Sequence, residues 1–224
     1  MSADAAGGEL RYIGKSVRKK DAVEKVTGRA RYVDDLPMHR ALIVCTLRSP
    51  VPHARIRRID ASAALALPGV KAVLTHENTP DVMYNSYWRE PVDDDRLLPD
   101  ERAFPPVVRH VGDRVAAVAA VTREIAEEAM ERIEVDYEHL PVVGDAEEAL
   151  KPGAPLLHGD TNLLKHVEWG HGSVEEGFGE CDLILEDVFE THVVAHTPME
   201  PHTYAADYDP HAKRLTVWTS TQGV

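Results

Sequence analysis

Three histidines and a glutamate, all residue types that bind metal ions, stand close together late in the sequence. They are His192, His196, Glu200 and His202. A zinc hydrolase helix places two histidines four residues apart with a glutamate between them, but no glutamate separates His192 from His196. Prolines at positions 198 and 201 also exclude a regular helix. Two interpretations stay open: a metal site, or turn and sheet residues bonded to the backbone.

The other residues that could do chemistry are scattered. The run Asp93-Asp94-Asp95 falls in a long polar stretch, where three acids are typical of a solvated turn rather than of a ligand set. His53 and His110 are single histidines beside turns, a place typical of structural histidines. No serine stands in a nucleophile elbow and no glycine-rich phosphate loop follows a strand. The residues alone do not predict a nucleophile, a base and an oxyanion site in one place.

The clearest element pattern is a strand–helix–strand unit at 111–141. Residues 115–121 are apolar without interruption, which predicts a strand covered on both faces. Thr122 supplies an N-cap oxygen for a helix whose apolar residues recur at helical spacing as far as Ile133. A strand at 134–137 follows, and this short unit predicts a crossover onto a partly parallel sheet.

A second unit of similar layout precedes the first one, and the two could share one sheet. Its predicted elements are strands at 41–47, 54–59 and 70–74 and an alanine-rich helix at 61–67 that Asp60 caps. After Pro141 the periodicity weakens, which indicates an extended linker over 142–166. Beyond it, Ser173 and Glu176 form a capping box that begins a short helix. Strands are expected at 183–194, 203–208 and 215–219, with a turn at 209–213 between the last two.

The overall composition, 43% hydrophobic and 28% charged, is that of an ordinary globular protein. Its net charge of -13 argues against general nucleic-acid binding, which needs a basic face. The stretch 11–31 nevertheless has a balance of +6, interpreted as a docking arm for an acidic surface or as a solvated terminus. No apolar run is long enough to span a bilayer, and no signal peptide is visible. With Cys45 expected in the core, the sequence predicts a cytoplasmic protein without membrane contact.

Several short blocks stand in a fixed order along the chain. They are DAVEKVTGRARYVDD at 21–35, RSPVPHARI at 48–56, PGV at 68–70, GDRVAAV at 112–118, VDYEHLP at 135–141, HTPMEPH at 196–202 and STQ at 220–222. Together they resemble the opening of the large, molybdenum-binding subunit of the xanthine dehydrogenase/aldehyde oxidase family. The start at 21–35 is similar to bacterial members such as the 4-hydroxybenzoyl-CoA reductase group.

The resemblance implies a fold of class α+β or mixed α/β. An α/β hammerhead domain with a mixed sheet and short crossover helices would be followed by an incomplete second α+β domain. The expected division is a disordered terminus at 1–10, the hammerhead domain at 11–141, the extended linker at 142–166 and the start of the molybdenum-cofactor-binding domain at 167–224.

The resemblance also implies an activity. In the family a molybdenum–pterin centre hydroxylates an aldehyde or an N-heterocycle with water, and electrons leave through iron–sulfur clusters to FAD; the reductase subgroup removes a phenolic hydroxyl. This chain would scaffold the Mo–molybdopterin subunit, with a second chain holding most of the cofactor. Other subunits would carry the 2Fe-2S clusters and FAD.

Two positions, Glu200 and Gln222, match the family and are the candidate cofactor-binding residues. No catalytic residue and no metal ligand is carried over. The family's Phe-Gly-Gly loop, its pterin-binding segments and its general-base glutamate are expected beyond Val224, and Val194 stands where many members have a glutamine. The isolated chain is therefore expected to be inactive.

Two other hypotheses belong to different classes. One is a non-catalytic assembly module that retains the hammerhead fold, and the other is a small metal-dependent hydrolase that uses His192, His196 and Glu200. A neighbouring gene that encodes the remainder would favour the oxidoreductase, and bound zinc would favour the hydrolase. The substrate stays open between an acyl-CoA, a purine and an aldehyde, as do the oligomeric state and the choice between a natural split subunit and a truncated product.

Overall fold

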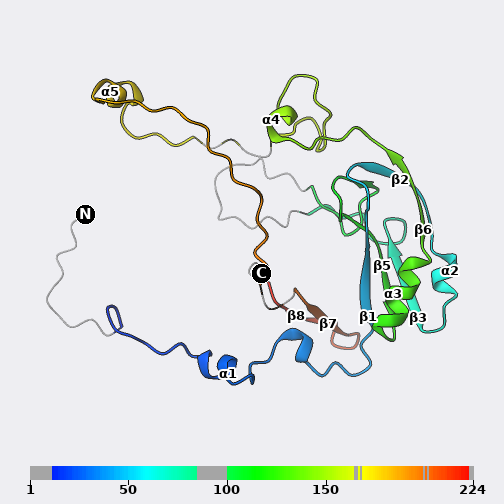
Figure 1. Cartoon of the computed structure of the whole chain (residues 1–224). Helices are drawn as coiled ribbons and strands as arrows, with labels where there is room; N and C mark the ends of the chain where they lie inside the picture. The colour runs from blue at the N-terminus through cyan, green and yellow to red at the C-terminus, as the bar shows by residue number, and fades with distance from the viewer. Residues whose placement is uncertain are drawn as a thin grey trace. The chain divides into compact units, whose positions relative to one another are not determined.

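The computed structural model describes residues 12–84, 100–163, 166, 168–198, 200 and 202–221 (Figure 1). Its elements are α1 (Ala22–Val26), η1 (Val33–Asp35), β1 (Ile43–Arg48), β2 (Ala54–Asp60), α2 (Ser62–Leu65), β3 (Val70–Thr75), β4 (Val107–Val108), β5 (Arg114–Ala120), α3 (Arg123–Glu131), β6 (Glu134–His139), α4 (Ala146–Ala149), α5 (Val174–Gly179), β7 (Tyr204–Asp209) and β8 (Arg214–Thr219). They form two compact units. The larger is 39–191, and the smaller joins the residues up to Met38 with those from His192.

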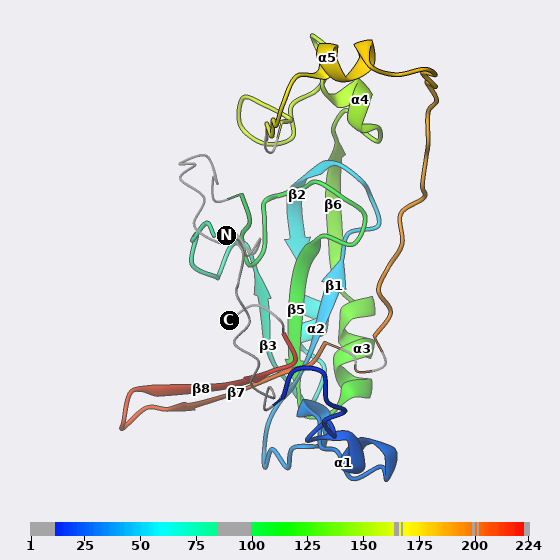
Figure 2. The ribbon, with the colours of Figure 1, turned by 90° about the vertical axis from the view of Figure 1, so that its left-hand side faces the viewer.

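The centre of the larger unit is β5, which lies between β1 and β3 in a three-stranded antiparallel sheet (Figure 2). Val118 pairs with Cys45 on one side and with Val73 on the other, and it is fully buried. A strand with neighbours on both edges and cover on both faces has no solvent-facing positions. The uninterrupted apolar sequence of β5 follows from that place, as predicted.

Helix α3 packs on this sheet and closes the main core. Its N-cap Thr122 accepts a hydrogen bond from the backbone N–H of Ile125, as the sequence predicted. Ala126 and Ala129 are fully buried in one cluster with the core residues of β5. The alanines let the helix approach the sheet closely, because they present no side chain beyond Cβ.

A second antiparallel sheet has β2 between β4 and β6, with Ile56 opposite Tyr137. Strands β5 and β6, which α3 connects, therefore lie in different sheets, and every strand pair among the described residues is antiparallel. The predicted crossover onto a partly parallel sheet is wrong, because β1 and β3 already occupy both edges of β5. Strands of the two predicted units do share sheets, since β5 pairs with β1 and β3, and β6 pairs with β2. The α+β, mixed α/β class is confirmed.

The connections are more ordered than the sequence suggested. The stretch predicted as an extended linker contains α4, capped by Asp145, whose carboxylate accepts from the N–H of Glu148. Asn162 then closes the following loop by donating to the carbonyls of Ala149 and Pro155. The predicted division into domains at 141 and 166 does not coincide with the two compact units and stays a prediction.

Residues 168–198 contain one short helix, α5, whose N-cap Ser173 accepts from the N–H of Glu176 as predicted. The strand predicted at 183–194 is wrong for the described chain, because 182–198 has no regular secondary structure. A strand exists only where another strand accepts its hydrogen bonds, and none of the described strands pairs with this stretch.

The smaller unit consists of α1, η1 and the β7–β8 hairpin. Ala206 lies opposite Val217, and the carboxylate of Asp209 accepts from the N–H groups of His211 and Ala212 in the turn. Both strands and the turn were predicted. Within this unit β7 contacts η1. In the described part of the chain, no helix has the length and apolar character needed to cross a membrane.

Candidate functional site

The hairpin brings two of the sequence blocks together. Beyond the last strand pair, Ser220 donates its N–H to the carbonyl of Thr203 at 3.3 Å. The N–H of Thr203 in turn donates to the hydroxyl of Ser220 at 3.0 Å. Position 200 and the end of the block at 196–202 thus lie near the start of the block at 220–222. Gln222 itself lies outside the described residues.

The candidate Glu200 is half-buried and belongs to the same unit as α1. The pKa of Lys25 on α1 is raised, first by its hydrogen bond to Asp21, whose carboxylate lies 2.7 Å from the ammonium, and further by negative charges that include Glu200. Lys25 is therefore a basic neighbour of the candidate site. Sequence reasoning missed it, because the spacing of two residues this far apart in the chain does not signal that the charge of one acts on the other.

The metal-binding residue types do not gather. His192, His196 and His202 are exposed. Among the described residues, no three His, Cys, Asp or Glu side chains are placed to hold a metal ion. The metal-dependent hydrolase therefore has no ligand set in the described chain. Asp93-Asp94-Asp95 lies outside the described residues.

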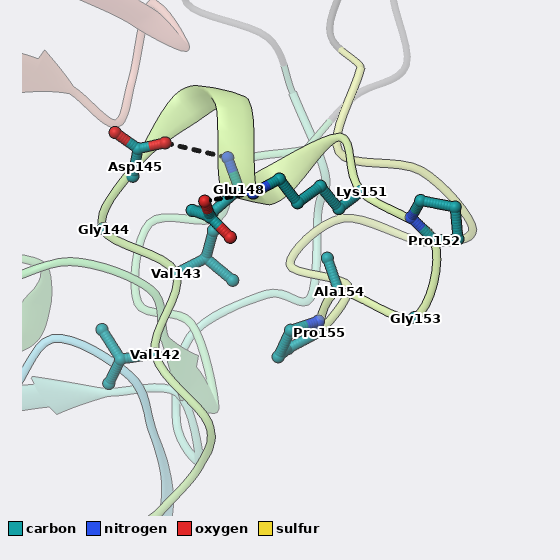
Figure 3. Close-up of a pocket in the computed structure, with 10 residues that line it drawn as sticks. All are labelled: Val142, Val143, Gly144, Asp145, Glu148, Lys151, Pro152, Gly153, Ala154 and Pro155. Atoms are coloured by element: carbon teal, nitrogen blue, oxygen red, sulfur yellow. Dashed lines mark hydrogen bonds and ion pairs between the residues drawn. The ribbon is translucent and has the colours of Figure 1, made fainter.

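An open hollow borders α4 and the loop after it, as Figure 3 shows. Its lining runs from Val142 to Pro155 and includes the paired side chains of Glu148 and Lys151. The charged side chains that line it bind groups of the chain itself: Asp145 caps α4, and Glu148 forms an ion pair with Lys151. No predicted site residue lies in this hollow, so we do not assign it a function.

Two polar contacts join the loop at 155–162 to residues 100 and 109 of the preceding domain. Arg109 donates from Nε to the carbonyl of Leu157 at 2.7 Å, and His158 Nδ1 lies 3.6 Å from a carboxylate oxygen of Asp100. Burial, then the charge of Arg109, lowers the pKa of His158, while Asp100 opposes the shift. The neutral form of His158 therefore predominates at pH 7.

Family models match two parts of the chain. The model described as "Aldehyde oxidase and xanthine dehydrogenase, a/b hammerhead domain" matches residues 27–141. The model described as "Molybdopterin cofactor-binding domain" matches residues 157–224. The first match contains both three-stranded sheets, and the second contains the hairpin and Glu200.

Relatives extend the similarity over nearly the whole chain. The nicotinate dehydrogenase large molybdopterin subunit of Eubacterium barkeri is 37% identical over 96% of this chain and 49% of its own length. The xanthine dehydrogenase molybdenum-binding subunit of Escherichia coli O157:H7 is 35% identical over 90% of this chain and 27% of its own length. The chain thus spans about half the length of the first relative and about a quarter of the second.

Solved structures agree with these relatives. Quinoline 2-oxidoreductase from Pseudomonas putida 86 superposes with a TM-score of 0.74 at 32% identity, covering 93% of this chain and 27% of that one. CO dehydrogenase from Oligotropha carboxidovorans gives a TM-score of 0.73 at 32% identity, covering 92% of this chain and 27% of that one. The fold, including its two small sheets, is therefore shared with much longer enzymes.

The described residues do not fit a bound molybdopterin by themselves. A group of that size needs an enclosed cradle with convergent polar atoms. Residues 168–198 are instead exposed throughout, with Trp169 97% and Val193 99% accessible. The part of the cofactor-binding domain present here supplies no such enclosure.

Proposed function

Because this chain belongs to the aldehyde oxidase and xanthine dehydrogenase family, we propose that it forms part of the molybdenum-binding subunit of an oxidoreductase complex. One observation carries the proposal: both family models match in order, and together they cover the chain from residue 27 to 224 apart from a short gap. The hammerhead core around β5 then acts as the scaffold. No catalytic step is assigned to this chain's own residues.

We propose further that most of the Mo–molybdopterin is held by a second chain, and that other subunits carry the 2Fe-2S clusters and FAD. The exposure of residues 168–198 is in line with a cradle that is completed by residues outside the described part of the chain. Glu200 and Gln222 are proposed as this chain's cofactor-binding residues. The half-buried place of Glu200 near the end of the hairpin supports its share of that role.

The substrate proposed is an aromatic N-heterocycle. The names of three similar proteins refer to such compounds: nicotinate, xanthine and quinoline. An assay of the purified complex with nicotinate, a purine and an aldehyde tests this, and preference for the aldehyde would refute it.

The experiment that tests the function is purification of the tagged chain from its native host, with mass spectrometry and molybdenum analysis of the product. We expect a second chain, iron–sulfur and FAD subunits, and molybdenum close to one atom per complex. Purification of the chain without other subunits and without molybdenum would overturn the proposal and favour the non-catalytic module. Glu200→Gln should lower the molybdenum content, whereas the matched change Glu175→Gln on exposed α5 should not.

We also propose a cytoplasmic location. The free thiols of Cys45 and Cys181 support it, because unpaired cysteines are typical of a reducing compartment. Cell fractionation with an antibody to the chain tests the location, and recovery from the periplasm or medium would refute it.

A further inference from the structure

The basic arm, residues 12–31, contains α1 and is rich in exposed cations (Figure 1). It has seven Lys or Arg and two acids, Asp21 and Glu24. Five of the cations form no ion pair with any described residue; they are Arg18, Lys19, Lys20, Arg29 and Arg31. The larger unit differs, since there Arg55 and Arg57 both bind Glu138. Most of the positive charge of the arm is therefore not neutralised within the described chain.

Apolar side chains stand between these cations and are uncovered as well. Helix α1 has no buried residue, and Val23 and Val26, three residues apart on one side of it, are 50% and 82% exposed. Before the helix, Ile13 and Val17 are 75% and 64% exposed. An apolar patch with a charged rim is the composition of a protein–protein interface.

The second half of the arm is held in shape by its own hydrogen bonds. The carbonyl of Glu24 accepts from the N–H groups of Arg29 and Ala30 at 2.8 and 3.1 Å. The hydroxyl of Thr27 donates to the carbonyl of Val23 at 2.6 Å. Beyond the arm, η1 contacts β7 within the smaller unit. The cations and valines are thus presented by a preformed element, which lowers the entropic cost of docking.

Resting on the function proposed above, we propose that the basic arm docks on an acidic protein surface of another subunit of the oxidoreductase complex. Charge complementarity selects an acidic partner, because the arm has an excess of cations without anions beside them. A nucleic acid would supply anions, but its phosphates would leave Val23 and Val26 uncovered, and the chain's net charge of -13 would repel it. A membrane is disfavoured because α1 has only five residues, one of them Glu24, and offers too little apolar surface for a membrane-bound helix.

Charge reversal in the complex purified from the native host tests the electrostatic part. Arg18→Glu with Lys20→Glu reverses two cations and should weaken binding of the partner subunit about tenfold, which is about 1.4 kcal/mol. The matched control is Arg40→Glu with Lys71→Glu, because these two cations of the larger unit are also exposed and form no ion pair with a described residue. It should leave binding within about twofold. Binding of the wild-type chain should weaken as the salt concentration rises, and the arm variant should lose most of that dependence.

Val26→Ser tests the apolar part, since it removes apolar surface without a change of charge. It should weaken binding about fivefold at every salt concentration. Val111→Ser is the control, because Val111 is 63% exposed in the larger unit and its loss should not affect binding. A carbodiimide then maps the contact, because it joins a lysine amine to a carboxylate that touches it. Lys19 and Lys20 should be joined to Asp or Glu of another subunit.

The outcomes separate this inference from the proposed function. Weaker binding with both arm variants, unchanged binding with their controls, and cross-links from Lys19 or Lys20 to another subunit support the inference. A complete molybdenum-containing complex that tolerates every arm variant overturns it and leaves the proposed function intact. Cross-links to a second copy of this chain alone, or binding of RNA or anionic vesicles in place of a subunit, overturn the proposed partner. A wild-type chain purified without other subunits and without molybdenum overturns the proposed function and this inference with it.

Discussion

Gly69 holds the turn between α2 and β3 in a conformation that only glycine adopts easily. Its φ is +99°, and its carbonyl accepts a hydrogen bond from the N–H of Val121 at 3.0 Å. A Cβ at this position would lie 2.7 Å from Ile125 Cδ1 and 3.0 Å from Val121 Cγ2. Gly69→Ala therefore adds backbone strain and a steric conflict at the place where α3 meets the first sheet.

The two contributions can be estimated separately. A side chain at positive φ costs about 1–2 kcal/mol. Moving Ile125 off its rotamer to make room adds about 0.5–1.5 kcal/mol. We expect Gly69→Ala to lower the free energy of unfolding by about 2–3 kcal/mol. Gly112→Ala is the matched control, because the φ of Gly112 is +94° and no heavy atom lies within 4 Å of its Cβ position. This change should therefore cost only the backbone strain of about 1–2 kcal/mol.

Native-state hydrogen exchange of the β5 amides in the full chain measures both changes, since these amides exchange through opening of the core. Ile125→Val removes the conflicting Cδ1 atom. In the Gly69→Ala background this substitution should therefore be about 1 kcal/mol less destabilising than in the wild-type chain. Equal effects of Gly69→Ala and Gly112→Ala, with no coupling to Ile125, would refute the steric argument.

Three further changes test other parts of the larger unit. Thr122→Ala removes the N-cap oxygen of α3 and should cost about 1 kcal/mol, seen as faster amide exchange in α3 with β6 unchanged. The carboxylate of Asp113, 8% exposed, accepts from two backbone N–H groups, so Asp113→Ala should destabilise by about 2–4 kcal/mol in urea unfolding; a loss under about 1 kcal/mol would contradict this. The pKa of His158 in the folded chain lies below its ordinary 6.5, so the unfolded chain binds this proton more readily. The free energy of unfolding therefore carries no penalty from His158 above about pH 6.5, and it falls as the pH drops from there toward the folded pKa. His158→Asn should make this fall less steep. An unchanged dependence of unfolding on pH would refute the lowered pKa of His158.

Local patterns predicted the elements whose own residues determine them. Thr122 with the apolar face of α3, Ser173 with α5, and the turn at Asp209 all depend on neighbours within a few residues. The pairing of strands does not, and β6 joined a different sheet from β5 because both edges of β5 were taken. The strand predicted at 183–194 is rich in apolar residues, but composition cannot provide the neighbouring backbone that makes a strand.

The candidate site was predictable only in part. Glu200 came from the match of a sequence block, and the structure adds Lys25 and the Thr203–Ser220 pair around it. The first acts on Glu200 through its charge and the second is a hydrogen-bonded pair, and both join residues far apart in the sequence, which no spacing rule contains. The role of Glu200 as a cofactor-binding residue stays a prediction, as does that of Gln222.

The smaller unit is made of both ends of the described chain, and this has a consequence for synthesis. The η1 turn leaves the ribosome about 170 residues before its partner β7. At about 5–20 residues per second the wait lasts roughly 10–35 s, while the larger unit has all its strands and can fold. During this wait η1 lacks the strand that it contacts in the folded unit. The order of synthesis therefore lets the core of the larger unit form before this contact does.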